Sequence, residues 1–261
     1  MKSFEKAESE KRSPVPQPSL PHAGESLSER ARDQWWDILF WSGLPLVVLV
    51  ACLEEWIHYL FRTPPSPFFL TAVFVGTSAL AGRKISTIYR GLPQLKLGAH
   101  GERIVGEKLD ALRAAGYRVF HDIQEENYNI DHVLIGPEGV FAIETKTRRK
   151  PRKGYAEVVY DGERVLVNGV EPDRDPIVQA KAGARRLCAI LREQTSIEVW
   201  VQPVVLYPGW YVKTLANGCA VTVENEEFFA RGRRMWSKGE NLTQERIDLL
   251  AAGMDRYLRR S

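Results

Sequence analysis

Two acidic side chains and one basic side chain could act together in the segment NIDHVLIGPEGVFAIETKT, residues 129–147. Asp131 lies near the start of one apolar run, and a second apolar run ends in Glu144 and Lys146. Because side chains alternate across a strand, Glu144 and Lys146 are predicted to project from the same face. The turn sequence GPEG at residues 136–139 predicts a hairpin, which would bring Asp131 beside Glu144.

Two carboxylates at the mouth of an apolar sheet cost free energy to desolvate unless a positive charge compensates them. We expect Mg²⁺ (or Mn²⁺) bound by Asp131, Glu144 and the backbone carbonyl of Thr145, because hard divalent ions prefer oxygen ligands, with waters completing the octahedron. Such an ion polarises a phosphodiester and lowers the pKa of a bound water. Lys146 could orient that water or stabilise charge developing on the phosphate. The alternative is a structural ion-pair group formed by the same three side chains.

The segment resembles the NERD (nuclease-related) branch of the PD-(D/E)XK nuclease superfamily. In that branch an Ile-Asp-His strand leads through Gly-Pro-x-Gly to a Val-Phe-x-Ile-Glu-x-Lys strand. Upstream, the sequence GAHGE, which ends in Glu102, is similar to the family's opening helix and its glutamate. Downstream, DPIVQ, which ends in Gln179, resembles the family's Asn-Pro-x-x-Gln, although Asp175 replaces the usual Asn. The resemblance covers roughly residues 97–206 in the right order.

The resemblance implies an α/β, restriction-endonuclease-like fold: a mixed sheet flanked by helices. It also implies Mg²⁺-dependent hydrolysis of phosphodiester bonds of DNA, as an endonuclease in DNA processing or defence. Asp131, Glu144 and Lys146 take the catalytic positions, and Glu102 and Gln179 supplement them. Glu102 could equally be a first-turn glutamate favoured by the helix dipole, and Gln179 could equally be solvated. The alternative function is a catalytically inactive module that binds nucleic acid or protein on the same fold.

Two further features lie beside these residues. A basic run could grip DNA phosphates in a salt-dependent contact, or could simply be solvated; it consists of Arg148, Arg149, Lys150, Arg152 and Lys153. His132 is next to Asp131, but strand alternation turns it to the opposite face. We interpret it as a packing or hydrogen-bonding histidine.

The elements that must position these groups follow from hydrophobic periodicity and turn residues. They are a helix over 102–115 with Gly116 as its C-cap, strands over 117–123, 130–135 and 140–146, a hairpin over 155–170 around Asp161-Gly162, a helix over 176–192, a strand over 197–206, a short strand over 220–223 and two short helices. The nuclease-like domain is therefore assigned to 96–210, and 211–261 completes or extends it.

The segment before this domain is strongly apolar. Residues 36–53 read WDILFWSGLPLVVLVACL. The length of this segment is close to that of a helix that crosses a bilayer core, about 20 residues. A buried core helix is the alternative, but the segment has no polar face. A second run over 68–81 is short; it either extends into its flanks or is re-entrant. We expect a transmembrane hairpin over 34–90, whose loop contains Glu54, Glu55, Arg62 and Pro64-Pro65.

Basic residues flank the expected hairpin on the side of both chain ends. They are Arg30 and Arg32 before the first helix and Arg83, Lys84, Arg90 and Lys96 after the second. The positive-inside rule then predicts a multi-pass protein of the cell membrane with the nuclease-like domain in the cytoplasm, where DNA is its expected partner. Residues 1–33, rich in Glu, Lys, Ser and Pro, are predicted to be a disordered tail.

The overall composition sets few further limits. The 261 residues carry 36 basic and 33 acidic side chains, and this near balance does not point to a strongly charged partner. Three scattered cysteines have neither zinc-finger spacing nor a disulfide framework, which favours a reducing compartment. No P-loop or catalytic-triad pattern is present. The oligomeric state is open, and a third interpretation makes the domain an oligomerisation scaffold for the hairpin.

Overall fold

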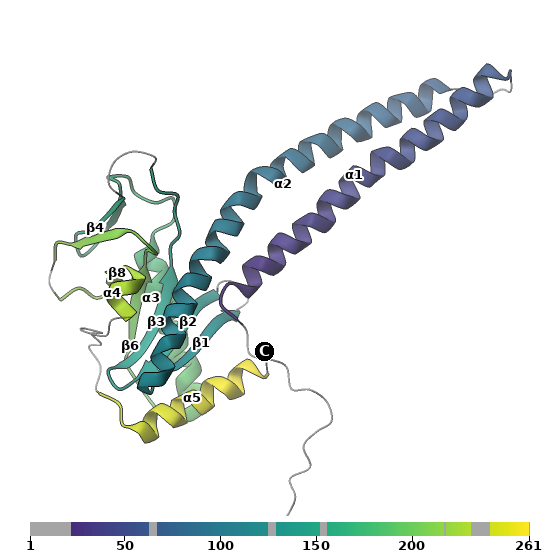
Figure 1. The fold of residues 1–261 in the computed structure, drawn as a ribbon. Helices are drawn as coiled ribbons and strands as arrows, with labels where there is room; N and C mark the ends of the chain where they lie inside the picture. Colours follow the sequence, from purple (N-terminus) through teal and green to yellow (C-terminus); the bar gives the residue numbers. More distant parts are fainter. Residues whose placement is uncertain are drawn as a thin grey trace, which may run out of the picture.

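The computed structural model describes residues 22–62, 67–124, 129–151, 156–216, 218–230 and 241–260. It combines a long helical hairpin with a mixed α/β domain (Figure 1). The hairpin consists of α1 (Glu25–Leu60) and α2 (Pro67–Asp110), which lie side by side. The end of α2 packs on the domain, so one helix belongs to both parts of the molecule.

The main sheet has five strands in the order β1-β2-β3-β6-β8. The strands are β1 (Arg118–Gln124), β2 (Asn129–Gly136), β3 (Gly139–Thr145), β6 (Val201–Leu206) and β8 (Thr222–Glu224). β1, β2 and β3 are antiparallel neighbours, whereas β3, β6 and β8 run parallel. The predicted turn closes β2 and β3 into a hairpin in which Gly136 pairs with Gly139.

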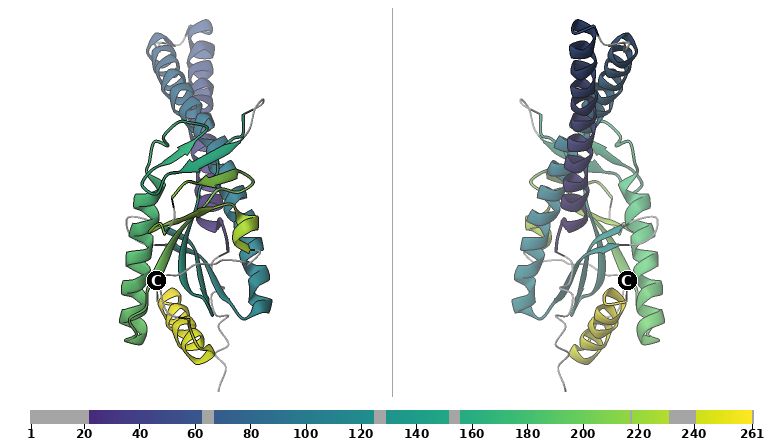
Figure 2. Two further views of the ribbon diagram at one scale, coloured as in Figure 1. Left: turned by 90° about the vertical axis from the view of Figure 1, so that its left-hand side faces the viewer. Right: turned by 90° about the vertical axis from the view of Figure 1, so that its right-hand side faces the viewer.

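Helices cover both faces of this sheet (Figure 2). On one face, the last turns of α2 bury Val105 and Leu109 against Leu134 and Phe141. On the other face, α3 (Pro176–Thr195) and α5 (Gln244–Leu258) pack over a second apolar cluster. The expected mixed sheet flanked by helices is therefore confirmed.

A smaller sheet lies beside the carboxyl ends of β3 and β6. It has the order β5-β4-β7, with β4 (Glu157–Tyr160), β5 (Val165–Val167) and β7 (Tyr211–Thr214). β4 and β5 form the predicted hairpin around Asp161-Gly162, although its expected start at Tyr155 lies outside the described residues. β7 was not predicted; it pairs parallel with β4. The domain also contains the short helices η1 (Ala111–Ala115) and α4 (Glu226–Ala230).

The first helix is longer than the sequence indicated. α1 already includes residues 25–33, which we had assigned to the disordered tail, while residues 1–21 lie outside the described part of the chain. Glu54 and Glu55 lie within α1 rather than in the loop, because glutamate is a good helix former and no glycine or proline lies between Glu54 and Phe61. The Pro64-Pro65 part of the predicted loop lies outside the described residues.

The second helix, α2, also differs from the prediction. We expected one helix in the membrane and a separate one starting at Glu102, but α2 is continuous from Pro67 to Asp110 and includes Pro93. Proline normally disfavours a helix interior. Here Ile88 and Leu92 of α2 are buried against Ile38 of α1, and this packing favours continuation of the helix.

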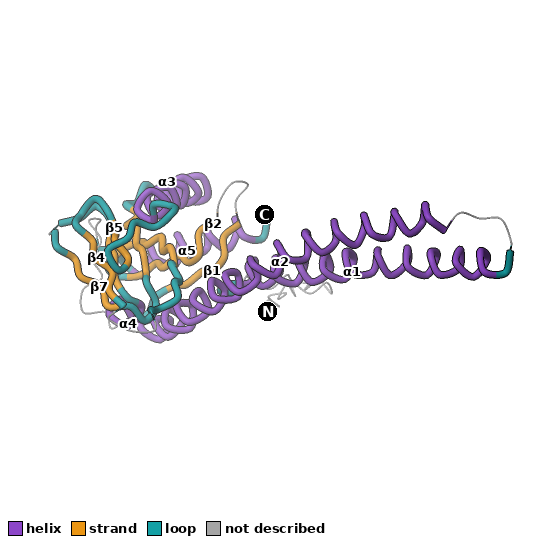
Figure 3. Tube along the Cα trace, turned by 90° about the horizontal axis from the view of Figure 1, so that it is seen from above, coloured by secondary structure: helices purple, strands orange, loops and turns teal. Residues whose placement is uncertain are grey.

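Both helices of the hairpin are long and apolar enough to cross a membrane. The hairpin projects away from the sheet (Figure 3). Within the most apolar stretch of each helix, only 11% of the residues of α1 and 6% of those of α2 are buried. A soluble core helix would instead bury such side chains. The three cysteines, Cys52, Cys188 and Cys219, are free thiols.

Candidate functional site

The strand register brings the two predicted metal-binding carboxylates together. β2 and β3 pair His132 with Ile143, and extending this register by one residue sets Asp131 opposite Glu144. Asp131 Oδ2 accepts a hydrogen bond from the backbone N–H of Thr145 at 2.7 Å. The negative charge of Glu144 also contributes to a raised pKa of Asp131, as expected for close neighbours.

Lys146 completes the cluster at the end of β3. Its Nζ lies 2.6 Å from Glu144 Oε1, so the two side chains share a face. Their side chains are 27% and 15% exposed, which leaves the ammonium partly open to solvent. The backbone N–H of Lys146 donates to the carbonyl of Leu206 at 2.8 Å and fixes this residue beside β6.

Glu102 reaches the site from α2. The preceding residue, Gly101, is buried against Thr147, and a Cβ at Gly101 would lie 1.8 Å from Thr147 Oγ1. Only glycine permits this approach of helix and strand end. Burial, followed by the negative charges of Asp122 and Glu144, raises the pKa of Glu102 to about 7, while Lys146 and Arg30 act in the opposite direction.

Asp131 has the most strongly perturbed carboxyl group of the site. Burial, followed by the charges of Glu144 and Glu102, raises its pKa well above the ordinary value. The N–H of Thr145 and the charge of Lys146 oppose this rise without cancelling it. The site therefore concentrates more negative charge than its single lysine neutralises.

Sequence reasoning missed Asp122. The register of β1 and β2 pairs His121 with His132 and Ile123 with Ile130, so Asp122 stands opposite Asp131 without joining the ladder. Its backbone is left-handed, with φ of 51°, and its side chain is buried at 3% exposure. Asp122, Asp131 and Glu144 thus occupy adjacent positions on three neighbouring strands. No sequence signal predicted this irregularity in β1.

Gln179 lies one turn into α3. Asp175 caps this helix by accepting from the backbone N–H groups of Ile177 and Val178, so Asp performs the capping role that the usual Asn would perform. Gln179 Oε1 is buried and has no hydrogen-bond partner among the described residues. Such an atom is suited to a ligand or water. Tyr207, also missed, is buried, and burial, followed by the charges of Asp175 and Glu144, raises its pKa.

His132 points away from this cluster, as predicted. Its Nδ1 lies 2.9 Å from His121 Nδ1, and His121 Nε2 lies 3.2 Å from Asp110 Oδ1. Burial, and then the charge of His121, lowers the pKa of His132 well below its usual range. The imidazole is therefore a neutral, hydrogen-bonded part of the packing beneath α2.

Carboxylate oxygens of the kind that a hard divalent ion prefers lie together here. Asp131 and Glu144 are adjacent, and each has one oxygen engaged with Thr145 or Lys146. The N–H and C=O of a strand residue point to the same side, so the carbonyl of Thr145 lies on the β2 side of β3, where its N–H meets Asp131. No group of three or more His, Cys, Asp or Glu among the described residues could itself hold a metal. Glu102 lies close enough for its charge to act on Asp131.

The basic run begins beside the site. Arg148, Arg149 and Lys150 are exposed, whereas Arg152 and Lys153 lie outside the described residues. Arg148 is close enough to Tyr207 for its charge to oppose the rise in the pKa of that phenol. The exposed guanidinium and ammonium groups are available to an anionic partner.

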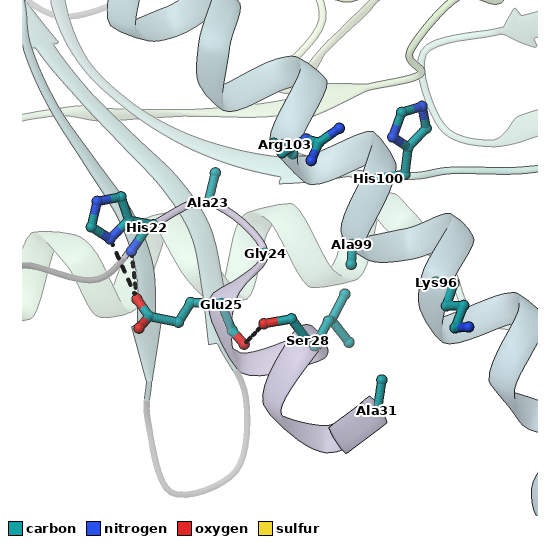
Figure 4. Close-up of a pocket in the computed structure, with 11 residues that line it drawn as sticks. His22, Ala23, Gly24, Glu25, Ser28, Ala31, Lys96, Ala99, His100 and Arg103 are labelled. Atoms are coloured by element: carbon teal, nitrogen blue, oxygen red, sulfur yellow. Dashed lines mark hydrogen bonds and ion pairs between the residues drawn. The ribbon is translucent and has the colours of Figure 1, made fainter. Parts of the chain in front are cut away.

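A cavity of about 610 Å³ lies between the first turns of α1 and one face of α2 (Figure 4). From α2 it is lined by Lys96, Ala99, His100 and Arg103. None of the five predicted catalytic residues lines it. The cavity is therefore a feature of the helix junction and not of the acidic cluster.

A mixed sheet flanked by helices, with an acidic pair and a lysine at the end of a central strand, defines a nuclease-like fold. Residues 97–208 match the model of the NERD family, described as the nuclease-related domain, so this part of the chain is similar to that family. No curated protein and no solved structure matches the chain.

Proposed function

We propose that the protein is a membrane-anchored, Mg²⁺-dependent nuclease that hydrolyses phosphodiester bonds of DNA, in DNA processing or defence. The observation that carries the proposal is the juxtaposition of Asp131, Glu144 and Lys146 within a nuclease-related domain. Structural ion pairs balance their charges, but here two acidic groups with Glu102 nearby face one lysine. Raised carboxyl pKa values of this kind favour a functional site.

Asp131, Glu144 and the carbonyl of Thr145 would hold the ion. When bound, Mg²⁺ supplies positive charge to a phosphate oxygen and makes a bound water more acidic. The ammonium of Lys146, fixed by Glu144 at 2.6 Å and partly exposed, is placed to stabilise negative charge on the phosphate or to orient the attacking water. Gln179 would position water or substrate through its unpartnered oxygen.

The exposed basic side chains beside the site favour a polyanionic substrate. Arg148, Arg149 and Lys150 leave the site along an exposed segment, where they can contact phosphates on either side of the cleaved bond. These contacts should depend on salt, because each phosphate contact releases counterions. DNA is the substrate that the predicted cytoplasmic placement and the family resemblance favour.

Membrane anchoring is supported by two aromatic contacts in the hairpin. Trp35 meets Tyr89 at 6.3 Å between ring centroids, and Trp56 meets Phe68 at 6.2 Å. On each helix 21 residues separate the two contacts, which corresponds to about 32 Å. The hydrocarbon core of a bilayer is about 30 Å thick, and aromatic side chains favour its two boundaries. The described hairpin therefore fits a full double span.

The test is cleavage of supercoiled plasmid by the full chain in detergent with Mg²⁺ or Mn²⁺. We expect wild type to cut and Lys146→Ala to lose at least about a hundredfold in rate, the scale of removing one charge-stabilising donor. Lys181→Ala is the matched control, since Lys181 is exposed on α3. If wild type does not cut with either metal, or if Lys146→Ala cuts as well as wild type, the non-cleaving binding module replaces the nuclease.

A further inference from the structure

The first turn of α1 is fastened to the strands that carry the site. Ser26 is buried at 6% exposure, although it belongs to the helix that runs into the hairpin. Its backbone N–H donates to Asp122 Oδ2 at 2.5 Å. Asn129 Nδ2, at the start of β2, donates more weakly to Ser26 Oγ at 3.4 Å. The helix begins at this contact, where its N–H groups have no partners within the helix.

Close packing supports the same contact from α2. A Cβ at Gly106 would lie 2.4 Å from the Cβ of Ala23, so the segment before α1 lies directly on α2. Figure 4 shows Ala23 and Gly24 lying beside the turn of α2 that carries Ala99. The start of α1 is thus held between β1 and the helix that carries Glu102.

Asp122 is shaped for this contact. Its left-handed backbone, with φ of 51°, breaks the ladder opposite Asp131, and aspartate tolerates that conformation better than most residues. The interruption leaves the buried carboxylate accepting from α1 rather than lying in a regular strand. This contact also affects the site through charge: Asp122 raises the pKa of Glu102, and Arg30 on α1 lowers it.

We propose that Asp122 is a positioning residue: it clasps the first turn of α1 to the site-bearing strands, so that the membrane hairpin and the site are held as one body. The part of the proposal that concerns the site rests on the proposed function. The clasp itself does not. Anchoring would then orient the acidic cluster through a defined contact, in addition to the covalent connection through α2.

Two substitutions at Asp122 separate the hydrogen bond from the backbone conformation. Asp122→Gly keeps the left-handed backbone and removes the acceptor. Asp122→Asn keeps both the backbone and an acceptor oxygen, and serves as the conservative rescue. Asn168→Gly is the matched control: Asn168 also has a positive φ, of 48°, and accepts from a backbone N–H, that of Glu157 at 3.0 Å, in the exposed β4–β5 hairpin.

Hydrogen–deuterium exchange of the full chain in detergent is the measurement. We expect Asp122→Gly to accelerate exchange at least about tenfold in peptides covering 22–30, because a buried N–H loses its acceptor. Peptides from β3 and β6 should stay protected. Asp122→Asn should stay near wild type, and Asn168→Gly should leave 22–30 unchanged. Unchanged exchange of 22–30 in Asp122→Gly overturns the clasp, as does acceleration spread equally over the whole domain.

The same variants report on the site. If wild type cleaves plasmid, Asp122→Gly should cut more slowly with Asp122→Asn restoring the rate, and equal rates for all three would overturn the coupling to the site. If wild type does not cleave, the proposed function fails while the exchange result still decides the clasp. The two failures are therefore distinguishable.

Discussion

Asp131, Glu144 and Glu102 crowd negative charge around one ammonium group, and burial increases the cost. Without a further cation, the free energy is lowest when the carboxyl groups keep their protons. The pKa values of Asp131 and Glu102 are therefore raised. A divalent ion relieves the same cost by a different route. Protons and metal should therefore compete for this cluster.

The protonation of Glu102 predicts how the free energy of unfolding changes with pH. The folded protein holds its proton up to about pH 7, whereas the unfolded chain loses it near the ordinary value of 4.5. Between pH 4.5 and about 7 the folded state binds more protons than the unfolded chain. The stability that protonated Glu102 contributes is therefore complete below pH 4.5 and is lost as the pH rises to about 7. Without metal, wild type should lose up to about 3 kcal/mol relative to Glu102→Gln between these pH values.

Urea unfolding at pH 5, 6 and 7.5 with EDTA measures this difference. The control is Glu107→Gln, since Glu107 is exposed on the same helix. Parallel pH profiles for wild type and Glu102→Gln would show that Glu102 is not held in a proton-retaining environment.

The core of the candidate site could be predicted because it depends on local rules. Strand alternation and one turn sequence were enough to place Asp131, Glu144 and Lys146 together. Asp122 and Tyr207 could not be found in this way. Asp122 enters the site through an irregularity in β1 and a contact with α1, 96 residues away in sequence, and Tyr207 through the packing of α3 on the end of β6.

At the scale of elements, α2 positions the site. Its close approach to the end of β3 depends on Gly101, whose absent side chain leaves room for Thr147. Sequence reading found the helix from Glu102 onward but not its continuity with the hairpin. Gly91 and Pro93, which lie between the two parts, locally disfavour a helix. The buried contacts of Ile88 and Leu92 with α1 outweigh that local preference, and such contacts between helices cannot be read from periodicity alone.

Gly101→Ala tests this packing. The new Cβ would lie 1.8 Å from Thr147 Oγ1, so Thr147 or the helix must shift. We expect a loss of about 1–3 kcal/mol in the free energy of unfolding, the usual cost of overpacking. Gly91→Ala, on the same helix with nothing within 4 Å, should be neutral or stabilising. Equal effects of the two substitutions in urea unfolding would contradict the close approach.

At the scale of the whole molecule, one continuous helix leads from the apolar hairpin to Glu102. The apolar surface of the hairpin is exposed, and its aromatic contacts are separated by about the thickness of a bilayer core. The sequence indicated the hairpin through its composition. It could not indicate that the start of α1 contacts the site-bearing strands at Ser26, since Ser26 and Asp122 are far apart in sequence.

Thiol labelling tests the orientation. The loop residue Arg62 is exposed at the far end of the hairpin, whereas Cys188 and Cys219 lie in the domain. With an impermeant maleimide and intact host cells, Arg62→Cys should react at once, and the domain thiols should react only after permeabilisation. Labelling of Cys219 in intact cells, with Arg62→Cys protected, would reverse the assigned topology.

We propose that Asp131 and Glu144 hold one divalent ion beside Lys146, and Mn²⁺ titration of the full chain by calorimetry measures this binding. We predict one bound ion for wild type, and at least about tenfold weaker binding for Asp131→Asn and for Glu144→Gln, because each removes a charged ligand. Asp161→Asn, which alters an exposed carboxylate of the β4–β5 hairpin, should bind as wild type does. Equal affinity in wild type and in both site variants would contradict the claim.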